Sequence, residues 1–100
     1  MTNLYEYVLP GKGEETVDTL LRDNGVRIER IVSNEARTGW YDQAEDEWVV
    51  LLEGTAELQI EEERVVLQRG DTLLLKAHRR HRVLACSQNA LWLTVFMREA

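Results

Sequence analysis

The sequence has a single cysteine, and this scarcity restricts the covalent and metal chemistry open to the protein. Cys86 has no second cysteine for an internal disulfide, and one thiol cannot build a thiolate metal cluster. Long apolar runs are also missing. No stretch reaches the roughly 18 apolar residues of a membrane-spanning helix, and the first residues hold no apolar core of a secretory signal. We therefore expect a soluble, cytoplasmic protein that does not bind membranes.

Basic residues are outnumbered by acidic ones. Twelve Lys and Arg face 18 Asp and Glu, so the formal net charge is −6. This balance argues against a broad surface for nucleic acid or anionic lipid. A phosphate-binding glycine loop is absent, and Ser33 and Ser87 lie in expected loops without a partnered base, so nucleophilic catalysis has little support.

What remains is the composition of one ordinary globular domain. The chain has 100 residues, of which 44% are hydrophobic and 30% charged. After residue 25 no segment keeps a helical period. Seven or eight short strands, with turn signals about every ten residues, predict an all-β sandwich or small barrel.

Two segments illustrate how the strands are recognised and where the pattern is ambiguous. Residues 56–61 alternate between apolar and polar side chains, as a half-buried strand does, and run into an acidic hairpin tip at residues 61–63. Residues 14–22 are ambiguous, because Val17, Leu20 and Leu21 suit one helical turn in a segment that is short for a helix. We expect residues 1–25 to form an N-terminal arm that packs on a barrel of residues 26–100.

The polar residues of the stretch 39–54 point to an internal site. Tyr41 and Gln43 are two apart, so on a strand they share a face, and Glu47 keeps the same parity beyond an acidic corner. These side chains could therefore converge in one pocket. A carboxylate turned inward at Glu47 needs a partner, because burying it alone is costly.

The same stretch carries a familiar spacing. In the pattern H-x-H-x3-E-x6-G, Glu47 takes the place of the glutamate and Gly54 that of the closing glycine. Tyr41 and Gln43 stand where the two histidines would be. The chain thus resembles the small single-domain cupins, and the resemblance implies a jelly-roll barrel.

A second motif of that family follows after 15 residues. It reads G-x5-P-x-G-x2-H, and here Gly70 and His81 match it, whereas Lys76 and His78 replace the proline and the second glycine. The resemblance covers roughly residues 26 to 97.

The resemblance implies a metal site that this chain meets only in part. In cupins two imidazoles, the glutamate and the last histidine hold iron, manganese or zinc. Here a phenol and a carboxamide replace two imidazoles, and this leaves Glu47 and His81 as the strong ligands, short of the usual number. His78 could add a third if its loop folds inward, although a histidine at such a place is more often on the surface.

Two classes of function therefore stay open. One is a binding module, whose internal small-molecule site is lined by Tyr41, Gln43, Glu47 and His81 and takes a small anion. The other is a metal-dependent enzyme of the isomerase or dioxygenase type that uses Glu47 and His81. Fold alone does not decide between them, because cupins host both kinds of protein.

Two surface features complete the predictions. The basic residues Lys76, Arg79, Arg80 and Arg82 form either a solvated rim or a mouth that attracts an anion. The stretch 48–52 and the last strand are apolar on both faces. An exposed patch of this kind usually marks an interface, so we expect a homodimer, with the N-terminal arm as the competing cover.

Overall fold

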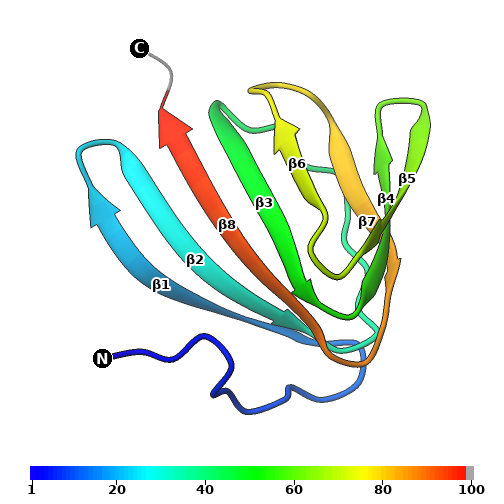
Figure 1. The fold of residues 1–100 in the computed structure, drawn as a ribbon. Helices are drawn as coiled ribbons and strands as arrows, with labels where there is room; N and C mark the ends of the chain where they lie inside the picture. The colour runs from blue at the N-terminus through cyan, green and yellow to red at the C-terminus, as the bar shows by residue number, and fades with distance from the viewer. Residues whose placement is uncertain (99–100) are drawn as a thin grey trace.

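The computed structural model describes residues 1–98, which fold into two antiparallel β-sheets (Figure 1). The all-β fold expected from the alternating side chains is confirmed. Within that range no helix is long and apolar enough to cross a membrane. The strands are β1 (Glu15–Asp23), β2 (Val26–Ser33), β3 (Glu45–Glu53), β4 (Thr55–Ile60), β5 (Glu63–Gln68), β6 (Thr72–Leu75), β7 (His81–Cys86) and β8 (Ala90–Arg98).

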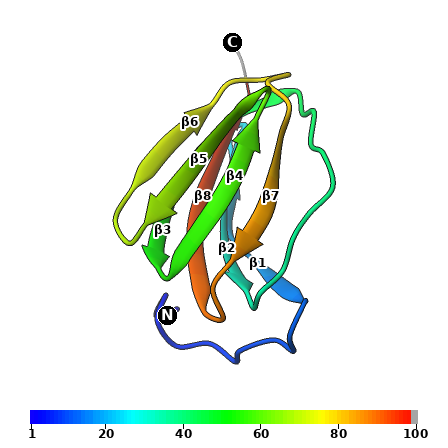
Figure 2. The ribbon, with the colours of Figure 1, turned by 90° about the vertical axis from the view of Figure 1, so that its right-hand side faces the viewer.

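The sheets are assembled from strands that are distant in the sequence. The larger sheet has the order β1-β2-β8-β3-β6 and the smaller the order β5-β4-β7. Figure 2 shows the smaller sheet in front of the larger one, with the apolar core between them. That core takes Val49, Leu51, Ala56, Leu58, Leu67, Ala90 and Trp92 from both sheets.

Strand β1 resolves the segment that was ambiguous in the sequence. Residues 15–23 form a strand paired with β2, not a helical turn. It is an edge strand with little cover on either face, since Val17 and Leu21 are 49% and 47% exposed. The pairing with β2 stabilises a conformation that the short, mixed pattern does not specify by itself.

The residues before β1 form an irregular segment that Arg30 of β2 holds in place. The Arg30 guanidinium donates to the backbone carbonyls of Asn3, Leu4 and Glu6 at 3.0 to 3.4 Å. It also pairs with Asp18 of β1 at 2.7 Å. Part of the expected arm is thus a strand of the larger sheet, and the boundary at residue 25 stays a prediction.

One face of the larger sheet points away from the core and is apolar. Trp48 of β3 stands opposite Leu74 of β6 on one side and Val95 of β8 on the other. Trp48 is 36% exposed and Leu74 47% exposed. We call the outward side chains Trp48, Val50, Leu74, Leu93 and Val95 the outer apolar face.

Candidate functional site

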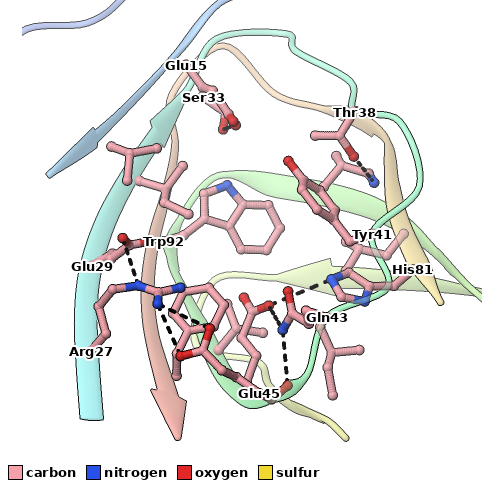
Figure 3. A pocket seen from close by; sticks show the side chains of 18 residues that line it. Glu15, Arg27, Glu29, Ser33, Thr38, Tyr41, Gln43, Glu45, His81 and Trp92 are labelled. Atoms are coloured by element: carbon pink, nitrogen blue, oxygen red, sulfur yellow. Dashed lines mark hydrogen bonds and ion pairs between the residues drawn. The ribbon is translucent and has the colours of Figure 1, made fainter. Parts of the chain in front are cut away.

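A cavity of about 360 Å³ lies on the inner side of the larger sheet (Figure 3). Its volume falls in the range of roughly 300–1,000 Å³ that is usual for ligand pockets. Strands β1, β2, β8 and β3 form one side, and β7 with the β2–β3 loop (residues 34–44) forms the other. The four residues expected at the site, Tyr41, Gln43, Glu47 and His81, all line this pocket.

The β2–β3 loop is held against β7 by backbone hydrogen bonds. Tyr41 and His81 exchange two of them, at 2.8 and 3.1 Å. The Thr38 N–H donates to the Val83 carbonyl at 3.0 Å, and the Val83 N–H donates to the Thr38 hydroxyl at 2.9 Å. The ring of Tyr41 stacks on the imidazole of His81 with 5.5 Å between centroids. The short strand expected at Tyr41 and Gln43 is therefore reduced to one isolated bridge. The two side chains still reach one pocket, because the loop follows β7.

Glu47 is a buried carboxylate, and each of its two oxygens accepts a hydrogen bond. Its Oε1 accepts a hydrogen bond from Gln43 Nε2 at 3.1 Å, and its Oε2 accepts one from Thr94 Oγ1 at 2.7 Å. The side chain of Glu47 is only 12% exposed. These donors offset the cost of burying the carboxylate. The sequence did not reveal Thr94, because its role depends on the pairing of β8 with β3.

His81 presents one ring nitrogen to the pocket. Its Nδ1 lies 3.0 Å from the carbonyl oxygen of Arg79, which can only accept, so Nδ1 carries a proton. Its Nε2 lies 3.7 Å from Glu47 Oε1, too far for a hydrogen bond. The imidazole is 7% exposed. Nε2 thus belongs to a buried ring, has no hydrogen bond to Glu47 and lines the pocket, where a bound molecule can reach it.

Tyr41 is kept in its protonated form. Burial raises the pKa of its phenol, and the negative charges of Glu15 and Glu47 raise this pKa further. A phenol that resists ionisation is a hydrogen-bond donor and a poor metal ligand. Tyr41 therefore serves the pocket as a neutral polar group.

The pocket has a second wall of charged residues, which the sequence analysis did not identify. Arg27 lies on β2, donates to Glu29 at 3.1 Å, and binds both oxygens of Glu45 on β3 at 3.1 Å. Its guanidinium also stacks over the ring of Phe96 at 4.1 Å. Glu15 of β1 completes this wall. The alternation of residues 26–33 gave a signal, but it does not tell which of two mixed faces turns inward.

His78 and the basic cluster lie apart from the pocket. His78 is exposed and pairs through Nδ1 with Asp42 at 2.8 Å, so the structure does not bring it to Glu47 and His81. Lys76 pairs with Asp46 at 2.9 Å. Arg80 and Arg82 stack on the ring of Trp40 at 4.6 and 4.4 Å. The cluster does not form the mouth of the pocket, because none of its basic residues lines the cavity.

The donor atoms do not fit the metal that the resemblance implies. Among residues 1–98 no group of three or more His, Cys, Asp or Glu side chains is placed to hold a metal ion. Glu47 is already bonded to Gln43 and Thr94. First-row divalent metals take three or more strong protein ligands at such sites. We therefore assign no step to a metal.

Comparisons with known proteins agree with the fold. The family model described as the cupin domain matches residues 27–96. A proposed mannose-6-phosphate isomerase from Ralstonia eutropha JMP134 is 35% identical, with a TM-score of 0.92 over 99% of this chain and 98% of that one. A search of curated proteins found no match.

Two more distant structures share the fold. A conserved protein of unknown function from Streptococcus pyogenes is 21% identical, with a TM-score of 0.85 over 100% of this chain and 88% of that one. KdgF from Halomonas sp. is 16% identical, with a TM-score of 0.78 over 86% of this chain and 80% of that one. The expected jelly-roll barrel is confirmed, and the chain belongs to the cupin family.

Proposed function

We propose that this cupin binds a small polar molecule inside the barrel and does so without a resident metal ion. One observation carries the proposal: both oxygens of Glu47 are bonded to Gln43 and Thr94, beside an unbonded nitrogen of His81. The carboxylate that would bind a metal in other cupins is here part of a hydrogen-bond network. His81 Nε2 and the Tyr41 hydroxyl also line the pocket and are among the groups that meet the ligand.

The first experiment tests the absence of a metal site. After chelator treatment, the native protein and the double variant Tyr41→His, Gln43→His are melted with and without zinc, manganese and ferrous iron. We expect little shift for the native protein. The variant gains two imidazoles, which with His81 and Glu47 make a set of three imidazoles and a carboxylate. It should therefore be stabilised by about 2.7 kcal/mol at a hundredfold excess over its dissociation constant.

A matched control shows whether metal binding requires the pocket or only two histidines at this spacing. Glu57 and Gln59 have the same spacing on β4, where the intervening Leu58 is buried and they are not. The variant Glu57→His, Gln59→His should respond to metals less than the pocket variant. Strong stabilisation of the native protein by any of the three metals would overturn the proposal.

The second experiment tests small-molecule binding. Trp92 lines the pocket, whereas Trp48 lies on the outer apolar face. A set of small polar compounds is added while the indole N–H signals are followed by NMR. Compounds that enter the barrel should move the Trp92 signal and leave that of Trp48 in place. If Trp48 moves and Trp92 does not, the binding site lies elsewhere.

The anion expected from the basic cluster is not part of the proposal. Arg27 is the one guanidinium among the pocket-lining residues of the described chain, and Glu29 and Glu45 both bond to it. A carboxylate or phosphate would enter a cavity that is lined by four glutamates and would find no unpaired guanidinium there.

A second candidate function is proton transfer on the bound molecule, and the geometry of His81 favours it. Its Nε2 faces the pocket at 3.7 Å from Glu47, while Nδ1 is fixed by the Arg79 carbonyl, which is an arrangement suited to a general base. The Ralstonia eutropha relative is named for an isomerase, and sugar isomerisation requires removal of a proton next to a carbonyl.

Deuterium exchange tests this second function. Mannose without a phosphate is incubated with the protein in deuterated water, and loss of its C2 proton signal is followed by NMR. Exchange that disappears in His81→Gln would support a proton-transfer enzyme. An unchanged C2 signal would show that mannose is not a substrate of the protein and would favour the binding function.

A further inference from the structure

We propose that the molecule bound in the barrel carries an amine that is protonated at neutral pH. This inference rests on the proposed small-molecule pocket and names the chemical class of its ligand. It is argued from the lining of the cavity. Glutamates outnumber basic residues there, and aromatic faces and the buried imidazole of His81 lie beside them.

The charge of the lining is strongly negative. The pocket is lined by Glu15, Glu29, Glu45 and Glu47, and by Arg27 as the one Lys or Arg among its lining residues. Three negative charges are thus left over when His81 is neutral. Water screens Glu29, Glu45 and Glu47 only in part, since their side chains are 15%, 31% and 12% exposed, whereas Glu15 is exposed at the rim.

The partners of these carboxylates do not remove the excess. Arg27 binds Glu29 and Glu45 together, so one guanidinium serves two carboxylates. The hydrogen bond recorded for Glu15 comes from the Ser33 hydroxyl at 3.3 Å, and the donors to Glu47 are an amide and a hydroxyl. Neutral donors satisfy the hydrogen bonding of a carboxylate and leave its charge in place.

The excess charge already has a visible effect on the opposite wall. The negative charges of Glu15 and Glu47 contribute to the raised pKa of the Tyr41 phenol, after burial. A potential that disfavours a phenolate favours a cation in the same space.

Aromatic rings supply the second half of an amine site. Trp92 is 5% exposed and lines the pocket, and Figure 3 shows its indole between the Glu15 and Glu29 side and the Tyr41 and His81 side. The face of an indole attracts cations more strongly than other rings do. Phe96 already uses this attraction for Arg27 at 4.1 Å. The cavity therefore offers a cation both carboxylates and an aromatic surface.

Three probes of one shape and different charge test the inference: cyclohexylammonium, cyclohexanol and cyclohexanecarboxylate. Binding is measured by calorimetry and by the Trp92 indole signal. We expect the ammonium to bind at least about tenfold more tightly than the alcohol, which corresponds to about 1.4 kcal/mol. The carboxylate should bind weakest, and added salt should reduce only the preference for the ammonium.

Charge-neutral variants identify the source of that preference. Glu15→Gln removes a charge for which residues 1–98 show no Lys or Arg ion pair, and Glu29→Gln leaves Arg27 paired with Glu45. Each should weaken binding of the ammonium several-fold and reduce its preference over the alcohol. Glu57→Gln is the matched control, because Glu57 pairs with Arg64 away from the pocket and should alter neither affinity.

The outcomes separate the two proposals. If the alcohol binds as tightly as the ammonium, or both Gln variants leave the preference intact, the amine inference is wrong while the pocket remains a small-molecule site. If none of the three probes moves the Trp92 signal, the pocket does not bind small molecules and both proposals fall.

Discussion

At the scale of single residues, the environment of Glu47 is the basis of the metal-free pocket that we propose. A neutral amide at Gln43 and a hydroxyl at Thr94 hold its oxygens at 3.1 and 2.7 Å. Neither group competes for a metal as an imidazole would, and both donate to the carboxylate. With tyrosine and glutamine at the two histidine positions, the glutamate accepts hydrogen bonds from Gln43 and Thr94, which supports the metal-free pocket that we propose.

The phenol of Tyr41 gives a prediction for alkaline pH. Its pKa is raised above the ordinary 10.0, first by burial and then by Glu15 and Glu47. The stabilisation linked to the neutral phenol is complete below pH 10 and is lost as the pH rises through the folded-state pKa. In an ultraviolet titration of the folded protein, the ionisation step that Tyr41→Phe removes should lie above pH 10.0.

Glu15→Gln tests the electrostatic part of that shift. Removal of the charge should bring the Tyr41 step to lower pH, whereas Glu57→Gln should not move it. If the step removed by Tyr41→Phe lay at or below pH 10.0, Tyr41 would not be in the environment described.

A second residue-scale prediction concerns Gly54, the closing glycine of the first motif. Its φ is +86°, and a Cβ there would meet Ser87 Oγ and lie 3.0 Å from Ala90 Cα. We expect Gly54→Ala to lower the free energy of unfolding by more than about 2 kcal/mol, because backbone strain and a steric clash add together.

Two other glycines separate these contributions. Gly70 has φ +90° with nothing within 4 Å of a Cβ, so Gly70→Ala should cost only the strain, about 1 kcal/mol. Gly39 has open space as well and no positive φ, so Gly39→Ala should be neutral or slightly stabilising. Denaturant unfolding gives all three values, and equal losses at Gly54 and Gly70 would contradict the predicted clash.

At the scale of elements, the strands differ in how far the sequence determines them. The alternation of residues 56–61 predicted β4 (Thr55–Ile60) to within one residue, because one face is buried and the other is not. Strand β1 was ambiguous, since its partner β2 rather than its own pattern holds it extended. The motif spacing placed Tyr41, Gln43, Glu47 and His81 in one pocket. The wall of Glu15, Arg27 and Glu29 could not be predicted, because it requires the non-local order β1-β2-β8-β3.

The exposure of β1 leads to a prediction about local stability. This strand is bonded to β2 alone and has little cover on either face, whereas β8 lies between β2 and β3. The amides of β1 that bond to β2 should therefore exchange with solvent much faster than those of β8. Hydrogen exchange followed by NMR measures both. Equal protection of the two strands would mean that something covers β1 in solution.

At the scale of the whole molecule, the outer apolar face supports the homodimer that we propose. Trp48 and Leu74 are exposed beside the partly buried Val50, Leu93 and Val95. The N-terminal segment is bonded to Arg30 on β2, and these bonds do not bring it to β3 or β6. A second copy is therefore the better candidate to cover this face.

Light scattering tests the dimer. The native protein should have twice the mass of one chain at micromolar concentration, and Trp48→Glu with Leu74→Glu should halve that mass. Val66→Glu is the control, because Val66 is 64% exposed on the smaller sheet, and it should leave the dimer intact. A native monomer at high micromolar concentration would contradict the dimer.

Elemental analysis of the native protein tests most directly whether the Glu47 and His81 pair belongs to a metal-free pocket. The protein is expressed without a histidine tag and purified without chelators, and its zinc, manganese and iron are counted per chain. Because Glu47 is bonded to Gln43 and Thr94, we expect far less than one ion per chain. Close to one ion per chain, lost in the variants Glu47→Gln and His81→Gln, would contradict the account and make the site a metal centre.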